Sequence, residues 1–371
     1  PMPDLACAAC GRVAEYADGR WRCECGGPFD SRQDRPFPRA ALSARPPGLW
    51  RYWEAFPLPG PEAAVSLGEG MTPLLPLRWD GVQVLCKLEF LTPTGSFKDR
   101  GAAVLLSLAR HLGVARVVED SSGNAAAAVA AYAAAAGLAC DLFVPADASP
   151  DKLAQARAYG AAVRAVPGGR EAAAGAAQQA AATTFYASHV WHPAFFAGTR
   201  TFAYEVWEQL EGQTPDALVL PAGHGTLLLG CWWGFGDLIR WGYLARGPRL
   251  IAVQADRCAP LANAWAGRES PAPERTVAEG IAISAPVRLR QMLRAVEETG
   301  GAVLAVPEEA IVSAWRRAAS AGLFVEPTAA AALAGLSAAL RGGLCRPDER
   351  IVVPLTGSGL KAASAVAQLL P

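Results

Sequence analysis

The sequence predicts an α/β protein in which helices flank parallel β-sheets. Short apolar runs that are typical of buried strands recur along the chain, and stretches of helical character lie between them. The runs are residues 82–90, 114–119, 138–145, 161–166, 217–221, 250–254 and 351–355. Strands that alternate with helices at this spacing indicate parallel pairing. With 371 residues, the chain is long enough for two domains, or for one large domain with a small appendage.

The composition is that of a folded protein without preference for a charged partner. Hydrophobic residues make up 52% of the chain, and 34 basic side chains balance 34 acidic ones. We therefore expect neither a nucleic acid nor a membrane as partner. The most apolar run, residues 125–140, is shorter than the roughly 20 residues of a membrane helix, so we expect a buried helix there. Residues 1–4 do not resemble the start of a signal peptide, which favours a cytoplasmic location.

Four of the nine cysteines lie near the start of the chain, at Cys7, Cys10, Cys23 and Cys25. A glycine follows each pair and lets the backbone turn tightly. Four thiolates around one centre suit a tetrahedral Zn²⁺ ion, so we expect a zinc-ribbon-like module. One alternative is a set of disulfides, which a reducing cytoplasm disfavours. The other is a flexible tail with unpaired thiols.

The segment 93–101 joins an apolar run to a helical stretch. Its glycine permits a tight turn, Ser96 can cap the following helix, and Asp99 complements the positive helix end. Lys98 therefore lies in the first helical turn, just past the carboxyl end of a strand, where α/β sheets bind ligands. Arg100 and the helix end disfavour a cationic amine, as a nucleophilic lysine requires. In isolation, such a lysine would be read as a surface residue.

Two further turns also join a strand to a helix. The first consists of Ser121, Ser122, Gly123 and Asn124. Its hydroxyl and N–H groups can bind a carboxylate, although a helix cap alone would look similar. The second consists of Gly223, His224, Gly225 and Thr226. Small residues at such a junction let backbone N–H groups and the helix dipole bind a phosphate.

In this order, the segments resemble those of the fold-type-II pyridoxal 5′-phosphate (PLP) enzymes of the tryptophan synthase β-like superfamily, and most closely threonine synthases. The resemblance is carried by Thr-Gly-Ser-Phe-Lys-Asp-Arg-Gly around Lys98 and by Gly-Glu-Gly-Met-Thr-Pro-Leu at residues 68–74. Glu-Pro at 326–327 and Thr-Gly-Ser-Gly-Leu-Lys at 356–361 extend it to nearly the whole chain. It implies a two-lobed α/β fold with PLP between the lobes.

The resemblance also assigns roles to single residues. Lys98 would bind PLP covalently and then move protons on the substrate. Gly223, His224, Gly225 and Thr226 would hold the cofactor phosphate. Asn124 and Thr356 would contact the ring of the cofactor. A threonine at position 356 would favour elimination and replacement chemistry over transamination. The substrate carboxylate would be bound by Ser121, Ser122, Gly123 and Asn124.

The resemblance weakens on the substrate side. Phe195 stands where threonine synthases have an arginine that grips the substrate phosphate, and His192 stands where they have an asparagine. A phenylalanine cannot donate to a phosphate, and such a lost contact costs roughly 2–5 kcal/mol in a closed site. Arg200 and His189 are nearby candidates to supply the missing charge.

We therefore expect a threonine synthase-like lyase that acts by elimination or replacement on a small amino acid. In the family, O-phosphohomoserine gives threonine and phosphate. One alternative is a dehydratase or replacement enzyme for an unphosphorylated amino acid such as serine or threonine. The other is a PLP-binding regulator without activity. A homodimer is the candidate assembly.

The expected organisation has two parts. Residues 1–40 form the zinc-ribbon-like module and a linker, and residues 41–371 form the catalytic region. Within the catalytic region, we expect a small mobile lobe at about 100–190 and a large lobe at about 41–99 and 191–371. Residues 27–62 are rich in Pro and Arg and are expected to wrap the main body as a linker.

Overall fold

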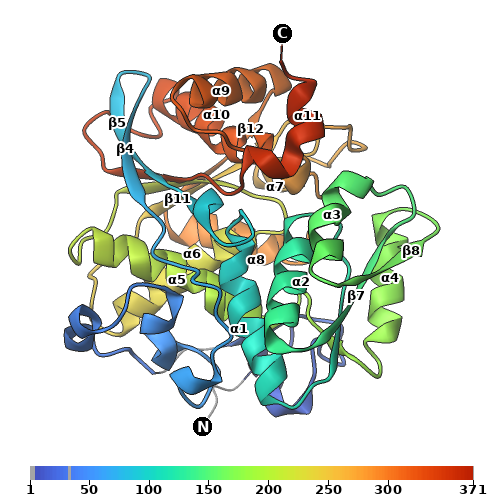
Figure 1. The fold of residues 1–371 in the computed structure, drawn as a ribbon. Helices are drawn as coiled ribbons and strands as arrows, with labels where there is room; N and C mark the ends of the chain where they lie inside the picture. Colours follow the sequence, from blue (N-terminus) through green and yellow to red (C-terminus); the bar gives the residue numbers. More distant parts are fainter. Residues whose placement is uncertain (1–4, 32–34, 371) are drawn as a thin grey trace. The chain divides into compact units, whose positions relative to one another are not determined.

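The computed structural model describes residues 5–31 and 35–370 (Figure 1). The expectation for residues 1–4, and the part of the expected N-terminal module at 32–34, lie outside the described residues. The chain forms two compact units. Unit 1 contains the chain up to Met71, Thr92–Thr94 and Lys98–Thr201, and unit 2 contains Thr72–Leu91, Gly95–Phe97 and the chain from Phe202 onward.

Unit 1 begins with a small antiparallel sheet in the order β2-β1-β3. Its strands are β1 (Leu5–Cys7), β2 (Val13–Ala14) and β3 (Phe29–Ser31). Short 3₁₀ helices follow, at Arg39–Ala44, Leu49–Ala55 and Pro61–Ala63. The linker expected at 27–62 thus consists mainly of turns, and Phe37, Tyr52 and Phe56 anchor it because their side chains are fully buried.

The rest of unit 1 is a four-stranded parallel sheet in the order β8-β7-β6-β9. The strands are β6 (Arg116–Glu119), β7 (Ala139–Pro145), β8 (Ala162–Val166) and β9 (Phe185–Tyr186). The helices are α1 (Lys98–His111), α2 (Asn124–Ala136), α3 (Pro150–Ala158) and α4 (Arg170–Ala180). In Figure 1, α2 and α3 lie on one side of this sheet and α4 on the other.

Helix α2 is the buried helix that the alanine-rich run predicts. Alanine has the highest helix propensity, and its small side chain lets α2 pack closely on α1, α3 and β7. The helix ends at Gly137, whose φ of 73° places it in the left-handed region and whose N–H bonds to the carbonyls of Ala133 and Ala134. Within the described part of the chain, no helix is long and apolar enough to cross a membrane.

Unit 2 contains a six-stranded sheet in the order β12-β11-β10-β13-β5-β4. Its strands are β4 (Leu74–Trp79), β5 (Val82–Lys87), β10 (Ala217–Pro221), β11 (Arg249–Ala255), β12 (Ala302–Val306) and β13 (Ile351–Pro354). All pairs are parallel except β4 with β5. That hairpin turns at Asp80 and Gly81, with φ of 48° and 82°, as a two-residue turn requires.

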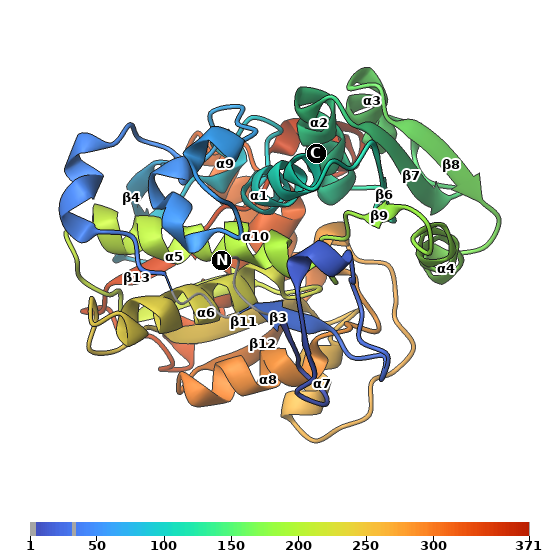
Figure 2. The same cartoon turned by 90° about the horizontal axis from the view of Figure 1, so that it is seen from below.

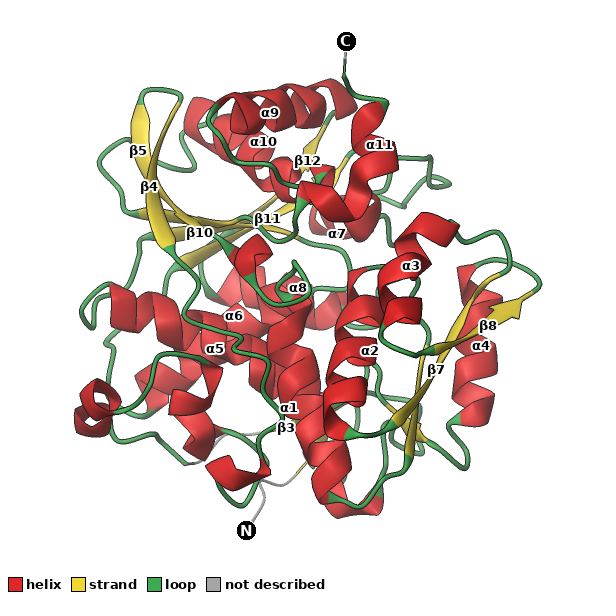
Figure 3. Cartoon of the chain, in the orientation of Figure 1, coloured by secondary structure: helices red, strands yellow, loops and turns green. Residues whose placement is uncertain are grey.

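Helices cover both faces of this sheet (Figure 3). They are α6 (Thr226–Arg240), α7 (Pro260–Trp265), α8 (Leu289–Glu298), α9 (Glu308–Ser320), α10 (Pro327–Arg341) and α11 (Ala363–Ala367). Helix α10 packs on β10 to β13 with α9 behind it, and α6 and α8 pack on β10, β11 and β12. Helix α10 starts with Pro327 after Glu326, which confirms the helix start expected there. Figure 2 shows α6 and α8 beside β11 and β12 from below.

Candidate active site

Lys98 is the first residue of α1 and so lies in the first helical turn, as the sequence predicts. The turn before it is closed by Asp99, whose side chain is fully buried. The Thr94 N–H donates to Asp99 Oδ2 at 2.7 Å, and the Thr94 hydroxyl donates to the same carboxylate. Gln155 of α3 donates from Nε2 to the Thr94 carbonyl at 3.1 Å. Lys98 is therefore carried on a turn that is fixed by hydrogen bonds from two sides.

Phe195 lies in α5 (Pro193–Gln209), beside Lys98. Its ring is fully buried, and Lys98 Nζ lies 6.0 Å from the ring centroid. A Cβ on Gly101 would come within 2.4 Å of the ring, and a Cβ on Gly198 would come within 1.9 Å of the Arg100 carbonyl oxygen. The two helices therefore approach so closely that only glycine fits at these two positions.

His189 is held by Glu119, the last residue of β6. His189 Nδ1 lies 2.5 Å from Glu119 Oε1, and both side chains are buried. Burial raises the pKa of Glu119 well above its usual range, and Asp120 raises it further, against the opposing charge of Lys98. The His189 ring lies 6.1 Å from that of Phe195, edge to face. Glu119, His189 and Phe195 thus form one series of neighbouring side chains that leads to Lys98.

His192 and Arg200 point instead toward the N-terminal module. The His192 ring lies 6.2 Å from that of Tyr16, and burial lowers the pKa of His192 to about 3, so the ring is neutral at pH 7. Arg200 Nη2 donates to the carbonyl oxygen of Ser31 in β3. His192, at the position of the family's asparagine, and Arg200, one of the two candidates for the missing charge, therefore contribute to packing within unit 1.

The turn of Ser121, Ser122, Gly123 and Asn124 connects β6 to α2. Gly123 is the N-cap residue of α2, and Asn124 is its first residue. The Gly123 N–H donates to Ser121 Oγ at 3.2 Å, which tightens the turn. Because the first N–H groups of a helix have no partner within it, this end of α2 offers donors to an anion.

In unit 2, the glycine turn expected to bind a phosphate leads from β10 into α6. Gly225 is the N-cap residue with φ of 79°, and a Cβ there would lie 2.2 Å from Met292 Sδ. The turn is held in place by Ala222, whose N–H bonds to the Val253 carbonyl at 2.8 Å. Thr226 is the first residue of α6, so the positive end of the helix dipole lies at the turn. The turn is shaped to receive an anion at a helix N-terminus.

Thr356 follows β13, the parallel neighbour of β10, so both loops leave the same edge of the sheet. Its side chain is 2% exposed, and Oγ1 has no hydrogen-bond partner among the residues that the structure describes. An unpaired buried hydroxyl costs about 1–3 kcal/mol, so a bound group that pairs with it would be stabilised. The Thr356 carbonyl accepts from Phe97 N–H at 3.1 Å. An aromatic nitrogen on a bound cofactor fits this hydroxyl.

The side chain of Lys87 is fully buried, and its amine makes three hydrogen bonds. Nζ lies 2.8 Å from Glu205 Oε2, 2.6 Å from the Thr72 carbonyl and 2.9 Å from Gln209 Oε1. Thr72 in turn donates to Glu89 Oε1 at 2.7 Å. This network holds Thr72, the first residue of the Gly-Glu-Gly-Met-Thr-Pro segment that belongs to unit 2, and it leaves Lys87 no donor for a ligand.

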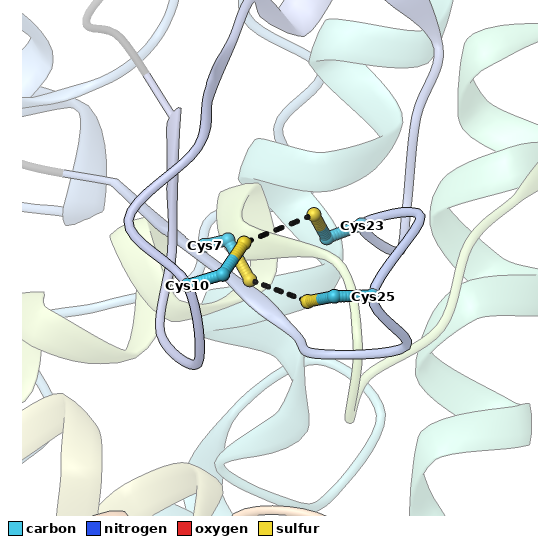
Figure 4. Close-up of side chains that lie close together, drawn as sticks. All are labelled: Cys7, Cys10, Cys23 and Cys25. Atoms are coloured by element: carbon cyan, nitrogen blue, oxygen red, sulfur yellow. Dashed lines mark hydrogen bonds between the residues drawn. The ribbon is translucent and has the colours of Figure 1, made fainter.

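The four N-terminal cysteines gather as the sequence predicts (Figure 4). Their sulfur atoms all lie within 4.8 Å of one another, with Cys7 and Cys25 at 3.4 Å and Cys10 and Cys23 at 3.7 Å. Sulfur ligands about 2.3 Å from a tetrahedral ion are about 3.8 Å apart. All four are free thiols, which excludes the disulfide alternative for this state of the chain. The cluster can bind a metal ion.

Glycines around the cluster make room for the sulfur atoms. Gly11 and Gly26 have φ of 74° and 85°, and a Cβ on Gly27 would lie 2.8 Å from the Cys7 sulfur. Burial opposes ionisation of Cys7, but the N–H groups of Cys10 and Ala9 outweigh it and lower the pKa of the thiol to about 7. A thiolate at neutral pH is the form that binds a metal.

Glu119 is the site residue that the sequence did not single out. The signal was a carboxylate at the end of an apolar strand, directly before the serine-rich turn. The Thr94–Asp99 bond is local to the turn, whereas the Gln155 contact carried no sequence signal, because it depends on where α3 packs.

The comparisons with known proteins agree with this geometry. The model of the family "pyridoxal-phosphate dependent enzyme" matches residues 65–357. The threonine synthase of Methanocaldococcus jannaschii is 35% identical over 97% of this chain and 93% of its own length. The threonine synthase of Methanosarcina acetivorans is 32% identical over 98% of this chain and 94% of its own length. A solved threonine deaminase, from the organism abbreviated T.th., is 30% identical, covers 77% of this chain and 92% of its own, and has a TM-score of 0.63. The chain therefore belongs to the pyridoxal-phosphate-dependent enzymes and, among them, to the threonine synthase family.

Proposed function

We propose that the protein is a lyase that catalyses elimination or replacement on the side chain of a small amino acid, with Lys98 as its catalytic residue. The observation that carries this proposal is the position of Lys98 at the start of α1, on a turn fixed by Thr94 and Asp99. The amine of Lys87 bonds to Glu205 and Gln209, within unit 2. PLP, when bound, supplies the electron sink that acidifies the substrate α-carbon.

The other roles follow the chemistry of each turn. Thr226 and the preceding residues Gly223, His224 and Gly225 hold the cofactor phosphate at the N-terminus of α6. Thr356 pairs its buried hydroxyl with the ring nitrogen, and Asn124 contacts the ring oxygen. The substrate carboxylate is bound by the donors of Ser121, Ser122, Gly123 and Asn124. Lys98 takes the α-proton and returns protons along the substrate side chain.

The substrate that we propose carries a less charged leaving group than phosphate. Phe195 offers a fully buried ring beside Lys98, where a phosphate would need a cation. Arg200 donates to Ser31, and His189 is bound to Glu119. This arrangement favours the second candidate, a dehydratase or replacement enzyme for an unphosphorylated amino acid, over O-phosphohomoserine as the preferred substrate.

We also propose one structural Zn²⁺ ion on the cysteines Cys7, Cys10, Cys23 and Cys25, within a module of residues 1–40. The mutual distances of the four sulfur atoms support it. The catalytic region would be residues 41–371, with about 100–190 as a mobile lobe and 41–99 and 191–371 as the large lobe. A substrate-dependent change in hydrogen exchange confined to about 100–190 would test the lobe assignment.

The experiment that decides the function is a steady-state comparison of substrates. O-phosphohomoserine, homoserine, threonine, serine and their O-acetyl esters are supplied to the PLP-loaded protein, and phosphate, ammonia and keto-acid release are measured. We expect a higher kcat/KM for an uncharged substrate. A high kcat/KM for O-phosphohomoserine that falls on Arg200→Ala would contradict the substrate proposal. No turnover of any of these amino acids would contradict the enzyme class itself.

A further inference from the structure

The four-cysteine module, residues 5–31, packs against the segment that carries Phe195. We call residues 185–200 the entry segment, because they lead from β9 into α5. The Trp21 ring lies 4.9 Å from that of Tyr186 and 5.3 Å from that of Trp191, edge to face in both cases. The Arg22 guanidinium lies over Trp21 and Trp191, at 4.9 Å and 5.9 Å. Aromatic edge-to-face pairs and cation–π contacts of this kind fix relative orientation.

Two more contacts connect the same parts. Tyr16 is buried beside the His192 ring, and the Ser31 carbonyl accepts the Arg200 guanidinium. The entry segment is thus held by the module near its start, at its centre and at its end. Trp21 and Arg22 come directly before Cys23, so the geometry of the cysteine cluster sets where their side chains lie.

The opposite side of the entry segment faces the lysine turn. His189 is bound to Glu119, and the Phe195 ring lies on Gly101 and under the Lys98 amine. Any shift of the segment therefore moves the ring that lies closest to Lys98. Since Gly101 and Gly198 leave no space between α1 and α5, such a shift cannot be absorbed by small adjustments there.

We propose that the cysteine module positions the substrate side of the active site, with Trp21 as the main positioning residue. The module is small and depends on its metal to order Trp21, Arg22 and Ser31. With the metal bound, these residues hold the entry segment and fix Phe195 beside Lys98. Without it, the entry segment loosens, and substrate recognition weakens before the cofactor is lost. The kinetic part of this proposal rests on the proposed function and its metal dependence rests on the proposed zinc site, whereas the positioning role of Trp21 rests on neither.

The test uses the full-length, PLP-loaded protein with Trp21→Ala, Trp21→Phe and Arg12→Ala. Arg12 pairs with exposed Glu24 in the same module and touches no residue of the entry segment in the contacts described, so it is the matched control. Hydrogen exchange of residues 185–200 and the visible circular dichroism of bound PLP are measured without substrate. KM and kcat are measured on the best amino-acid substrate. Exchange in β10 and α6 reports whether the rest of the chain stays folded.

We expect Trp21→Ala to speed exchange in the entry segment, to change the visible circular dichroism and to raise KM about tenfold, with kcat changed less than about threefold. Trp21→Phe should keep exchange, dichroism and KM close to their wild-type values, and Arg12→Ala should change none of the three. Chelation of the metal should reproduce the Trp21→Ala exchange pattern. Unchanged exchange, dichroism and KM in Trp21→Ala, with only a lower melting temperature, would overturn the proposal. If no amino acid is turned over, the proposed function fails, but exchange and dichroism still decide the positioning role.

Discussion

The ring of Phe195 lies against Gly101, one turn along the helix from Lys98, with no room for a Cβ between them. This contact explains why a phenylalanine at this position is more than a missing arginine. It fills the space between α1 and α5, and it forms an apolar wall beside the lysine amine. Both the chemistry of Lys98 and the choice of substrate therefore depend on how these two helices pack.

Lys98 is the residue that we expect to carry PLP. Borohydride reduction followed by peptide mapping should place the pyridoxyl group on the peptide with Lys98. Lys98→Ala should lose the visible absorbance of bound PLP and all turnover, because no other amine replaces it. Lys87 is the control: Lys87→Met should leave Glu205 buried and uncompensated, at a cost of about 3–5 kcal/mol of stability. Label on Lys87, Lys152 or Lys361 in the wild type would contradict the assignment.

Phe195→Arg should shift selectivity toward O-phosphohomoserine. The guanidinium adds a donor for phosphate, so the ratio of kcat/KM for O-phosphohomoserine to that for an uncharged substrate should rise tens to thousands of fold, as about 2–5 kcal/mol implies. The same change buries a charge against Gly101, and stability should fall by about 3 kcal/mol or more. Phe195→Leu is the control, since it removes the ring without adding a donor. An unchanged ratio in Phe195→Arg would show that the phosphate does not reach this position.

One zinc ion per chain should copurify with the protein, even without an affinity tag that binds metal. The free energy of zinc binding is on the order of 10–16 kcal/mol in isolated zinc peptides, which is enough to order a module of this size. Metal analysis should therefore give stoichiometric zinc, and Cys23→Ser should reduce it strongly. Cys258→Ser, at a buried cysteine of unit 2, serves as control. Substoichiometric metal together with four freely titrating thiols at positions 7, 10, 23 and 25 would rule the site out.

His192 should make the protein sensitive to acid. Burial lowers the pKa of His192 to about 3, against about 6.5 in an unfolded chain, so between these values the folded state binds fewer protons. The contribution of His192 to the free energy of unfolding is therefore fully present above about pH 6.5 and is lost as the pH falls. At pH 5 the loss should reach about 2 kcal/mol. Urea unfolding at pH 7.5 and pH 5 should show this loss in the wild type and in His111→Asn, whose histidine is exposed, but not in His192→Asn. If the free energy of unfolding depends on pH equally in the wild type and in both variants, this prediction is wrong.

The parts of the fold that the sequence predicted are those with strong local signals. The strands β10, β11 and β13 are largely apolar, because both faces of a parallel sheet are buried, and β5, β6 and β7 combine apolar residues with a few polar ones. The two edge strands of unit 2 were not predicted. β12 is Ala-Val-Leu-Ala-Val, an apolar run that could have indicated a strand. β4 contains Pro76, which is typical of an edge strand, and the Asp-Gly hairpin turn was the signal that could have found it.

The sequence by itself determined the family and the cysteine cluster, and it predicted the helix start that carries Lys98, because each depends on residues that are close together in the chain or ordered along it. Only the tertiary structure decided the partners of His189, His192 and Arg200. Their partners Glu119, Tyr16 and Ser31 lie at least 70 positions away along the chain. Local contacts accompany them, of His189 with Phe195 and of His192 with Phe185 and Ala194. Whether a cation faces a substrate or a carbonyl depends on how helices and strands pack, and local sequence does not encode that packing.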